Sequence, residues 1–413
     1  MMMPRERLPS VANRPRKNGN ARRRQIALLI ETSNAYARGL LEGISAYVQE
    51  HRSWSVELAE HSRGGFEPSA LAGWKGDGVI ARVENPQIAR VVRRCALPTV
   101  DLSAARLLPE IPWVETDNAA IARLAIEHLL ERGFRSLGYF GLTGYNWSTW
   151  RRDHFVSLAK QAGCSCSIHM MRGRADSAQR WSVERRKIAA WLVKLPKPAG
   201  VFACFDTCGR HVLEACRIAG LRVPDDVAVV GVDNDPLLCE LADPPLSSVA
   251  PDAPQTGYLA ATLLDRMMAG GKVELAGHFV RPRGIVTRRS TDVTVIVDRD
   301  ISAAVRFIRD NACRGITVTD VLGQIALSRR VFEKRFAALV GRTPHQQIVR
   351  NQIERAKDLL AATDLPLKTI AARVGVSHAE YLNTLFRRSE GTTPGRYRRT
   401  RVAPNDTVIG EIT

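Results

Sequence analysis

The feature that most constrains this 413-residue sequence is a local pattern that occurs twice between residues 318 and 396, about fifty residues apart. Each copy has a short helical pattern, a tight turn at Ala326 or Gly375, and a second helical pattern. Just before the second helix stand Ser328 and Ser377, residues of a type that caps a helix through its side-chain oxygen. The sequence therefore predicts two helix-turn-helix units in tandem.

The second helix of each copy combines an apolar stripe with a polar face. Apolar residues at helical spacing are expected to pack inward: Phe332, Phe336 and Leu339 in the first copy, and Leu382, Leu385 and Phe386 in the second. A glycine that can end the helix in a left-handed conformation follows each of them, Gly341 and Gly391. The remaining face is free to contact a partner and carries Arg329, Arg330, Glu333 and Lys334 in the first copy, and Ala379, Glu380, Asn383, Thr384 and Arg387 in the second.

An amphipathic helix with basic residues is also typical of an ordinary solvated surface. The duplication and the local charge favour a nucleic acid partner instead. Residues 301–402 contain nineteen Lys and Arg against eight Asp and Glu, in a chain of net charge +18. Such a surplus attracts a polyanion, and a polar helix of this kind fits the major groove of double-stranded DNA.

Two further motifs accompany the repeated units: Ala356-Lys-Asp-Leu-Leu lies between them, and Gly391-Thr-Thr-Pro-Gly-Arg-Tyr397-Arg398 follows the second. With these motifs, this region of about a hundred residues resembles the DNA-binding domain of the AraC family. The resemblance implies two recognition helices, held by a connecting helix from Pro344 to Ala361, that enter successive major grooves on one side of bent DNA. Ala379 and Thr384 are small where that family often has long polar residues. The base-contacting positions that it implies are Arg329, Arg330, Glu333, Lys334, Ala379, Glu380, Tyr381 and Thr384, and Ser328, His378 and Arg398 are expected to contact DNA beside them.

From Arg24 onward, short apolar runs alternate with helical patterns over about 250 residues. This alternation predicts parallel α/β sheets covered by helices, with a ligand site at the carboxyl ends of the strands and between two lobes. The expected strands are 26–30, 78–82, 99–102, 137–140, 168–171, 200–204 and 227–232, and the expected helices are 36–50, 86–94, 118–131, 151–161, 181–195 and 207–219.

Polar residues follow several of these strands, where ligand-binding groups are expected. Asn34, Tyr36 and Arg38 follow the first strand, and Asp206 and Asp233 follow two later ones. Carboxylates and guanidinium groups hold sugar hydroxyls through charge-assisted hydrogen bonds. The alternatives are a helix N-cap for Asp206 and a turn residue for Asp233.

Five segments of residues 24 to about 290 resemble the LacI-type, periplasmic-binding-protein-like effector domain: Asp117-Asn-Ala-Ala, Arg151-Arg-Asp-His-Phe155, Phe205-Asp206, Gly231-Val-Asp233-Asn and Leu246-Ser-Ser-Val. The resemblance implies that Arg151, Asp206 and Asp233 hold sugar hydroxyls, and that the loop from Asn34 to Arg38 closes the pocket from the other lobe. On charge alone, Arg151 is a solvated residue at a helix start. Asp117 belongs to the predicted site through its motif, and Trp147 or Trp150 is expected to stack on a sugar ring, with plain packing as the alternative.

An effector domain of this type normally follows its DNA-binding unit, whereas here the order is reversed. That order, with Asn34-Ala-Tyr36-Ala-Arg38 and Arg288-Arg-Ser-Thr-Asp292, is similar to a family of regulators of pentose use. The resemblance implies a sugar-responsive activator that responds to a pentose of the xylose type, works as a homodimer and contacts RNA polymerase. The expected parts are a disordered basic tail (1–22), a sugar-binding domain of two Rossmann-like lobes (23–290), a linker (291–300), a DNA-binding domain (301–402) and a second tail (403–413).

The other function classes find less support. A transport receptor needs an export signal, but the early apolar run Ile26–Ile30 is too short for a signal peptide or a membrane span, so we expect a cytoplasmic protein. No phosphate loop, GxSxG or HExxH pattern predicts an enzyme or a cofactor, although Asp206 and Asp233 are left as an alternative carboxylate pair for carbohydrate chemistry. Eight Cys without a CxxC pair indicate free thiols; a metal at Cys204 and Cys208 is the alternative, and we expect no metal.

Overall fold

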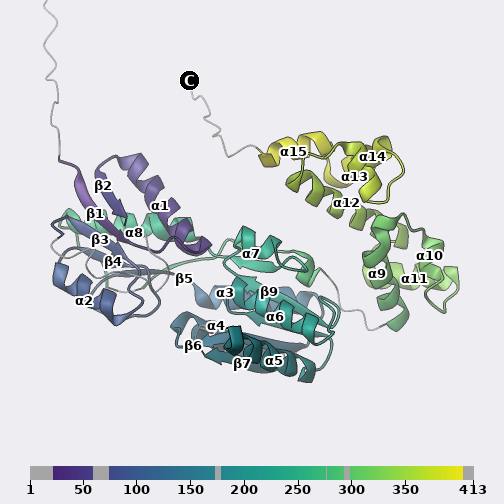
Figure 1. The fold of residues 1–413 in the computed structure, drawn as a ribbon, viewed down its shortest axis with the longest axis horizontal. Helices are drawn as coiled ribbons and strands as arrows, with labels where there is room; N and C mark the ends of the chain where they lie inside the picture. The colour runs from purple at the N-terminus through teal and green to yellow at the C-terminus, as the bar shows by residue number, and fades with distance from the viewer. Residues whose placement is uncertain (1–21, 59–73, 173–177, 276, 293–297, 403–413) are drawn as a thin grey trace, which may run out of the picture.

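The computed structural model describes residues 22–58, 74–172, 178–275, 277–292 and 298–402. Two α/β lobes come first in the chain, and a helical domain, residues 298–402, follows them (Figure 1). Nearly all of the predicted basic tail, the second predicted tail and the middle of the predicted linker lie outside the described residues.

The first lobe is built on a six-stranded sheet in which all strands are parallel. Its central strands are apolar on both sides, as expected for a sheet covered on both faces. One face packs on helices α1 (Ala35–His51) and α8 (Ala253–Met268), and the other packs on α2 (Pro86–Cys95). The strand order is β11 (Gly277–Val280), β5 (Trp113–Thr116), β4 (Thr99–Asp101), β3 (Gly78–Ala81), β1 (Arg24–Leu29) and β2 (Trp54–Leu58).

The second lobe has a six-stranded sheet that is parallel except at one edge, where β12 is antiparallel to β10. Tyr139, Phe155 and Phe202 form the centre of its core. The strand order is β12 (Gly284–Val286), β10 (Ser247–Ala250), β9 (Val227–Val232), β8 (Ala199–Ala203), β6 (Ser136–Thr143) and β7 (Ser165–Arg172). Its helices are α3 (Asn118–Glu131), α4 (Asn146–Gln161), α5 (Ala178–Lys194), α6 (Asp206–Ile218), α7 (Pro236–Glu240) and the 3-10 turn η2 (Arg289–Thr291).

The chain crosses between the lobes more than once. It leaves the first lobe after β5, returns after β10 to form α8 and β11, and then crosses again to β12. The carboxyl ends of several strands from both lobes therefore face one another. The predicted architecture, two lobes with parallel sheets followed by a helical domain, is confirmed.

The helical domain contains two apolar cores that share one long helix, α12 (Pro344–Ala362). Phe332 and Phe336 fill the first core, and Leu382 and Phe386 fill the second. The other helices are α9 (Arg299–Asn311), the 3-10 turn η3 (Ala312–Arg314), α10 (Val318–Leu322), α11 (Arg329–Val340), α13 (Leu367–Arg373), α14 (Ala379–Glu390) and α15 (Pro394–Val402). Nowhere in the described residues is a helix long and apolar enough to span a membrane.

Three local expectations for this domain are wrong. The N-cap of α14 is His378 rather than Ser377, and Ser328 caps α11 without a side-chain hydrogen bond. Leu339 is 48% exposed and does not join the apolar stripe. In contrast, Gly341 and Gly391 end their helices in the left-handed conformation, at φ 75° and 68°.

The two halves of the helical domain meet at a close backbone contact. Gly375, the turn glycine of the second unit, has φ 71°, and a Cβ at this position would lie 2.5 Å from the Gly315 nitrogen. Beside this contact, the buried Gln352 of α12 donates to the Ala312 carbonyl at 3.0 Å. Glycine is required here because any side chain would push the two halves apart.

Replacement of Gly375 by alanine should therefore destabilise the helical domain by more than the about 1–2 kcal/mol of a left-handed residue alone. Gly391→Ala is the matched control, because Gly391 is also left-handed but nothing lies within 4 Å of its added Cβ. Urea unfolding of both variants measures the difference. Equal losses of stability would contradict a packing role for Gly375.

Candidate functional site: a cavity between the lobes and a basic helical domain

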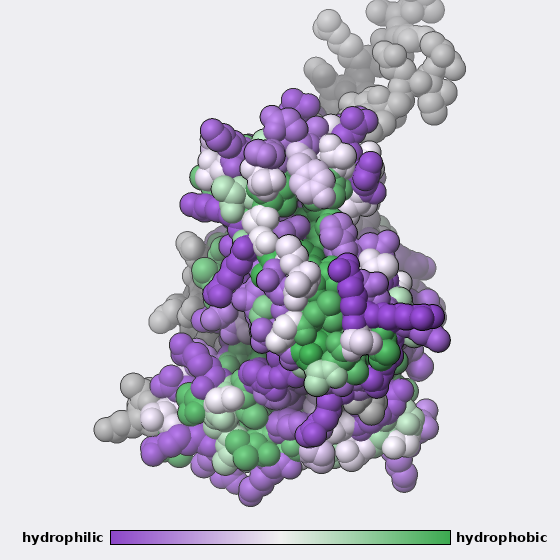
Figure 2. Space-filling model, turned by 90° about the vertical axis from the view of Figure 1, so that its right-hand side faces the viewer, coloured by the Kyte–Doolittle hydropathy of each residue, from purple (hydrophilic) through white to green (hydrophobic). Residues whose placement is uncertain are grey.

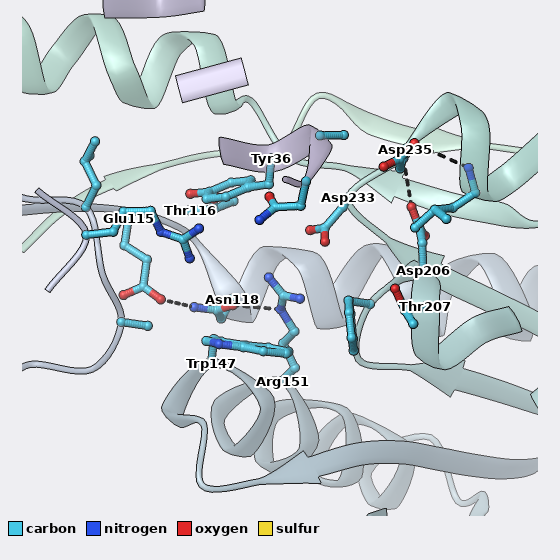
Figure 3. Close-up of a pocket in the computed structure, with 17 residues that line it drawn as sticks. Tyr36, Glu115, Thr116, Asn118, Trp147, Arg151, Asp206, Thr207, Asp233 and Asp235 are labelled. Atoms are coloured by element: carbon cyan, nitrogen blue, oxygen red, sulfur yellow. Dashed lines mark hydrogen bonds between the residues drawn. The ribbon is translucent and has the colours of Figure 1, made fainter. Parts of the chain in front are cut away.

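A cavity of about 100 Å³ lies between the two lobes (Figure 3). The first lobe contributes the start of α1 and the ends of β3, β4 and β5. The second lobe contributes α4, the start of α6 and the loop that follows β9. The lining residues are Asn34, Ala35, Tyr36, Arg82, Leu102, Ala104, Glu115, Thr116, Asn118, Trp147, Arg151, Phe205, Asp206, Thr207, Asp233, Asp235 and Leu238.

Arg151 forms the floor of the cavity. Its guanidinium donates from Nε to the Asn118 side chain at 2.8 Å and from Nη1 to the Cys204 carbonyl at 2.5 Å. Its Cζ also lies 5.1 Å from the centre of the Trp147 ring. These contacts fix the plane of a side chain that is only 7% exposed. Among the described residues none accepts from Nη2, so this nitrogen can donate to a ligand.

Asp206 is held by several donors of the second lobe. Its carboxylate accepts from the Ser248 hydroxyl at 2.6 Å, from the Asp235 backbone nitrogen at 2.8 Å and from the Cys239 thiol at 3.4 Å. Burial, followed by the nearby Asp233 carboxylate, raises the pKa of Asp206 to about 8, although these donors oppose the shift. Asp206 therefore fixes the loop after β9 as well as lining the cavity.

The loop after β9 has a strained backbone. Asp233 and Asn234 have φ 103° and 49°, values that non-glycine residues adopt at a cost of about 1–3 kcal/mol each. The Asp233 nitrogen donates to the Val249 carbonyl at 3.0 Å, and Asn234 is held through Ser248 and Arg288. The strain directs the Asp233 carboxylate into the space between Tyr36 and Arg151 (Figure 3).

The first lobe supplies a wall of paired polar groups. The Tyr36 hydroxyl lies 3.1 Å from the Thr116 hydroxyl, and burial raises the pKa of Tyr36. Glu115 pairs with Arg106 and accepts from Asn118 at 2.6 Å. Arg82 pairs with Glu31 and, at 2.6 Å, with Glu84. The wall thus offers fixed oxygens and nitrogens to a polar ligand.

The predicted ligand residues fall into two groups. Six of them line the cavity: Asn34, Tyr36, Trp147, Arg151, Asp206 and Asp233. Three lie outside it: Arg38, Asp117 and Trp150. Asp117 caps α3 by accepting from the Ala120 nitrogen at 2.9 Å, and Trp150 lies 5.6 Å from the Arg106 guanidinium. Arg38 lies 3.9 Å from the Asp235 carboxylate of the other lobe, and Asp235 itself lines the cavity.

The positions of Asp206 and Asn34 relative to their helices define what each can do. Asp206 is the first residue of α6 and does not cap it, because the N-cap is Phe205. Asn34 is an N-cap: its side-chain oxygen accepts from Ala37 and its amide nitrogen donates to Glu31. Asn34 therefore shapes the cavity while its amide is already engaged.

Sequence reasoning missed several lining residues, chiefly Arg82, Glu115, Thr116, Asn118 and Asp235. Arg82 directly follows β3, and Glu115 and Thr116 end β5. The rule that identified Asp206 and Asp233, a polar residue at a strand end, would have found Arg82. It would also have found Glu115 and Thr116 if β5 had been recognised as a strand.

On the helical domain, most of the predicted DNA-contacting residues are exposed. Figure 2, viewed from the side on which this domain lies in Figure 1, shows many hydrophilic side chains on this face, around a hydrophobic strip down its middle. Glu333, Ala379, Asn383 and Arg398 are partly buried. The exposed ones are Ser328, Arg329, Arg330, Lys334, His378, Glu380, Tyr381, Thr384 and Arg387.

Two of the predicted contacts have other partners in the domain. Arg329 pairs with Glu333 one turn along α11 at 3.0 Å. Arg398 donates to the Leu365 carbonyl at 2.6 Å and so holds α15 against the loop before α13. This contact gives Arg398 a structural role, and its contact with DNA stays a prediction.

Fold and site together define a class of protein: a two-lobed, periplasmic-binding-protein-like sensor joined to an AraC-type DNA-binding domain. Comparisons with known families agree. Residues 126–291 match the periplasmic binding protein-like domain, residues 323–400 match a helix-turn-helix domain, and residues 25–119 match the XylR N-terminal domain.

The chain belongs to the family of xylose operon regulatory proteins. It is 33% identical to that protein of Escherichia coli K12 over 385 residues, which cover 91% of this chain and 97% of the relative. The Haemophilus influenzae protein of the same name is 32% identical over 91% of this chain and 98% of its own length. A solved structure described as the xylose-binding transcription activator xylR has a TM-score of 0.75 and 32% identity, covering 92% of this chain and 98% of that one. The chain is a sugar-responsive DNA-binding transcriptional regulator.

The raised pKa of Asp206 has a consequence for stability. A carboxyl whose pKa lies near 8 in the fold, but near its ordinary 3.8 when unfolded, keeps a proton that the unfolded chain releases. Its contribution to stability is therefore present at low pH and is lost as pH rises from about 4 to about 8. Asp206→Asn, which does not titrate, should gain in melting temperature relative to wild type between pH 5 and pH 8. A difference in melting temperature between the variant and wild type that does not change with pH would contradict the raised pKa of Asp206.

Proposed function

We propose that this chain is a cytoplasmic activator of genes for pentose utilisation, with xylose or a close relative as its effector. The main support for the proposal is that one chain contains both a polar cavity between two lobes and a double helix-turn-helix domain. The names of its relatives, xylose operon regulatory proteins, support the choice of sugar. So does the solved structure of a xylose-binding activator.

In this proposal the sugar is held by groups of both lobes. Arg151 Nη2 donates to one hydroxyl, and the Asp233 carboxylate accepts from another. Trp147, which packs on Phe205 and beneath Arg151, offers an apolar face to the sugar ring. Asp206 acts mainly by holding the loop that presents Asp233, because its oxygens already accept from Ser248, Asp235 and Cys239.

We assign sugar binding to residues 23–290, DNA binding to residues 301–402 and the connection to residues 291–300. Helices α11 and α14 enter successive major grooves, with Arg330 and Lys334 as the main contacts of the first helix. The Arg329–Glu333 pair lies at the edge of that helix. The second helix contributes less to base selection, because Ala379 is small and the Thr384 hydroxyl donates to the Glu380 carbonyl at 3.0 Å.

The proposed active form is a homodimer, formed through the first lobe, that binds two half-sites and contacts RNA polymerase. A sugar moves such an equilibrium only if it binds one arrangement of the lobes more tightly than the other. Arg38 of the first lobe and Asp235 of the second lobe, 3.9 Å apart, are placed to favour a closed arrangement.

The proposal includes no catalysis. Carbohydrate hydrolysis requires a carboxylic acid and a carboxylate on either side of the scissile bond. Asp206, the one candidate partner for Asp233 named from the sequence, is 1% exposed and turned toward Ser248 and the Asp235 backbone. These contacts favour a positioning role.

The proposal is tested by thermal unfolding with a panel of pentoses and hexoses. A ligand at one hundred times its dissociation constant stabilises the native state by about 2.7 kcal/mol, and xylose should therefore raise the melting temperature by several degrees. No shift with any neutral sugar would overturn the choice of effector.

Asp233→Asn should remove most of this xylose-induced shift, because the variant loses the charge that accepts a sugar hydroxyl while asparagine tolerates the positive φ. Asp117→Asn is the matched control. Asp117 lies outside the cavity and caps α3, and asparagine caps a helix equally well. A full xylose shift in Asp233→Asn, or its loss in Asp117→Asn, would contradict the assigned roles.

A further inference from the structure

A bidentate ion pair joins the second lobe to the helical domain. Arg309 of α9 donates from Nη1 to Asp225 Oδ1 at 3.0 Å and from Nη2 to Asp225 Oδ2. The two side chains are 17% and 15% exposed, which limits screening by solvent. The fork of an arginine on a carboxylate fixes direction as well as distance. The pair is therefore suited to hold α9 in one orientation on the second lobe.

The turn that presents Asp225 is itself rigid. Asp226, the next residue, accepts from the Arg222 backbone nitrogen at 2.9 Å and from its guanidinium at 3.0 and 2.8 Å. The Asp226 nitrogen in turn donates to the Arg222 carbonyl at 2.8 Å. Because Asp226 closes the turn, the Asp225 carboxylate is directed at α9.

The elements on either side of this turn lead directly to the cavity. Strand β9 begins at Val227, immediately after Asp226, and its six residues are all buried up to Val232, which precedes Asp233. Helix α6 begins at Asp206 and ends at Ile218, shortly before the turn. The cavity and the ion pair thus lie at opposite ends of the same two packed elements, and a movement of the second lobe displaces both.

On the other side of the ion pair, α9 is coupled to the first recognition helix. Ile301, Ala304 and Ile308 of α9 are buried in the same core as Phe332 and Phe336 of α11. A second ion pair joins the helices, because Arg335 of α11 contacts Asp298, the N-cap of α9, at 2.5 Å. The orientation of α9 therefore sets the orientation of α11.

We propose that Arg309 and Asp225 are positioning residues: through this pair, the second lobe sets the orientation of the first recognition helix. When sugar moves the second lobe, the same pair transmits the movement to the helix that contacts DNA. The inference rests on the proposed function, because it needs a sugar that moves the lobe. It predicts that breaking the pair separates sugar binding from the DNA response while each domain keeps its own ligand.

The test uses the full chain and three charge variants: Asp225→Arg, Arg309→Asp and the double exchange of both. The quantity measured is the ratio of affinities for a DNA fragment with two half-sites, with and without saturating xylose. In each single variant this ratio should fall to within about twofold of one, whereas coupling factors of about 5–150 are typical of intact allosteric proteins. The double exchange should restore most of the wild-type ratio.

Two further readouts separate a positioning role from general damage. The xylose-induced shift in melting temperature and the affinity for a single half-site should stay near wild type in both single variants. Arg93→Glu, which breaks the exposed pair of Arg93 with Glu110 in the first lobe, is the charge-reversal control and should leave the ratio unchanged.

The outcomes distinguish this inference from the proposed function. A wild-type ratio of one would overturn the proposed function, and the inference with it. A wild-type ratio well above one that both single variants preserve would overturn the inference alone. Loss of the ratio in the single variants without recovery in the double exchange would also count against the ion pair as the coupling contact.

Discussion

A buried guanidinium at the boundary between two lobes is the constraint on which the sensor depends. Arg151 cannot be taken from water without partners, and it finds them in the Asn118 side chain and the Cys204 carbonyl. Asn118 starts α3 where the chain enters the second lobe, and Cys204 directly follows β8. One side chain thus connects the lobe crossing to the cavity floor, and within the described part of the chain no residue accepts from its Nη2.

In the second lobe, too, single side chains form hydrogen bonds to more than one element. Ser248 accepts from the Asn234 nitrogen and donates to Asp206, so that a single hydroxyl joins two parts of the cavity. Arg288 extends the network from Asn234 to Glu240 and to the Leu246 carbonyl, and the neighbouring Thr291 is held by His128 and Ser247 at 2.7 Å each. The last turn of the two-lobed domain is therefore fixed to the lobe that carries Asp233. The Arg309–Asp225 pair is a further contact between this lobe and the helical domain.

Features that depend on residues close together in the chain were predicted correctly from the sequence. Helix α3 and strand β9 have the predicted bounds, because a cap before one and an unbroken apolar run in the other mark their ends. The two recognition helices were found from their apolar spacing and closing glycines. Asp206 and Asp233 were named as polar residues that follow strands, Arg151 was named from the resemblance to the effector domain, and the cavity contains all three.

The features that were not predicted from the sequence depend on how distant parts of the chain are arranged. The return of α8 and β11 to the first lobe leaves no trace in local periodicity, and the short strand β5 was not expected, so Glu115 and Thr116 were missed. Trp150 was as plausible as Trp147, but only Trp147 faces the cavity. The hydrogen bond of Arg398 to the Leu365 carbonyl, 33 residues away, could not be predicted from local pattern either.

If sugar bound in the cavity is coupled to DNA bound on the helical domain, the two binding equilibria depend on each other. The measurement is the dissociation constant of xylose, by calorimetry, for the free protein and for the protein bound to DNA with two half-sites. Coupling must be reciprocal, so DNA should tighten xylose binding by the same factor, on the order of 5–150, by which xylose tightens DNA binding. Equal xylose affinities in the presence and absence of DNA would contradict coupling between the sugar site and the DNA site.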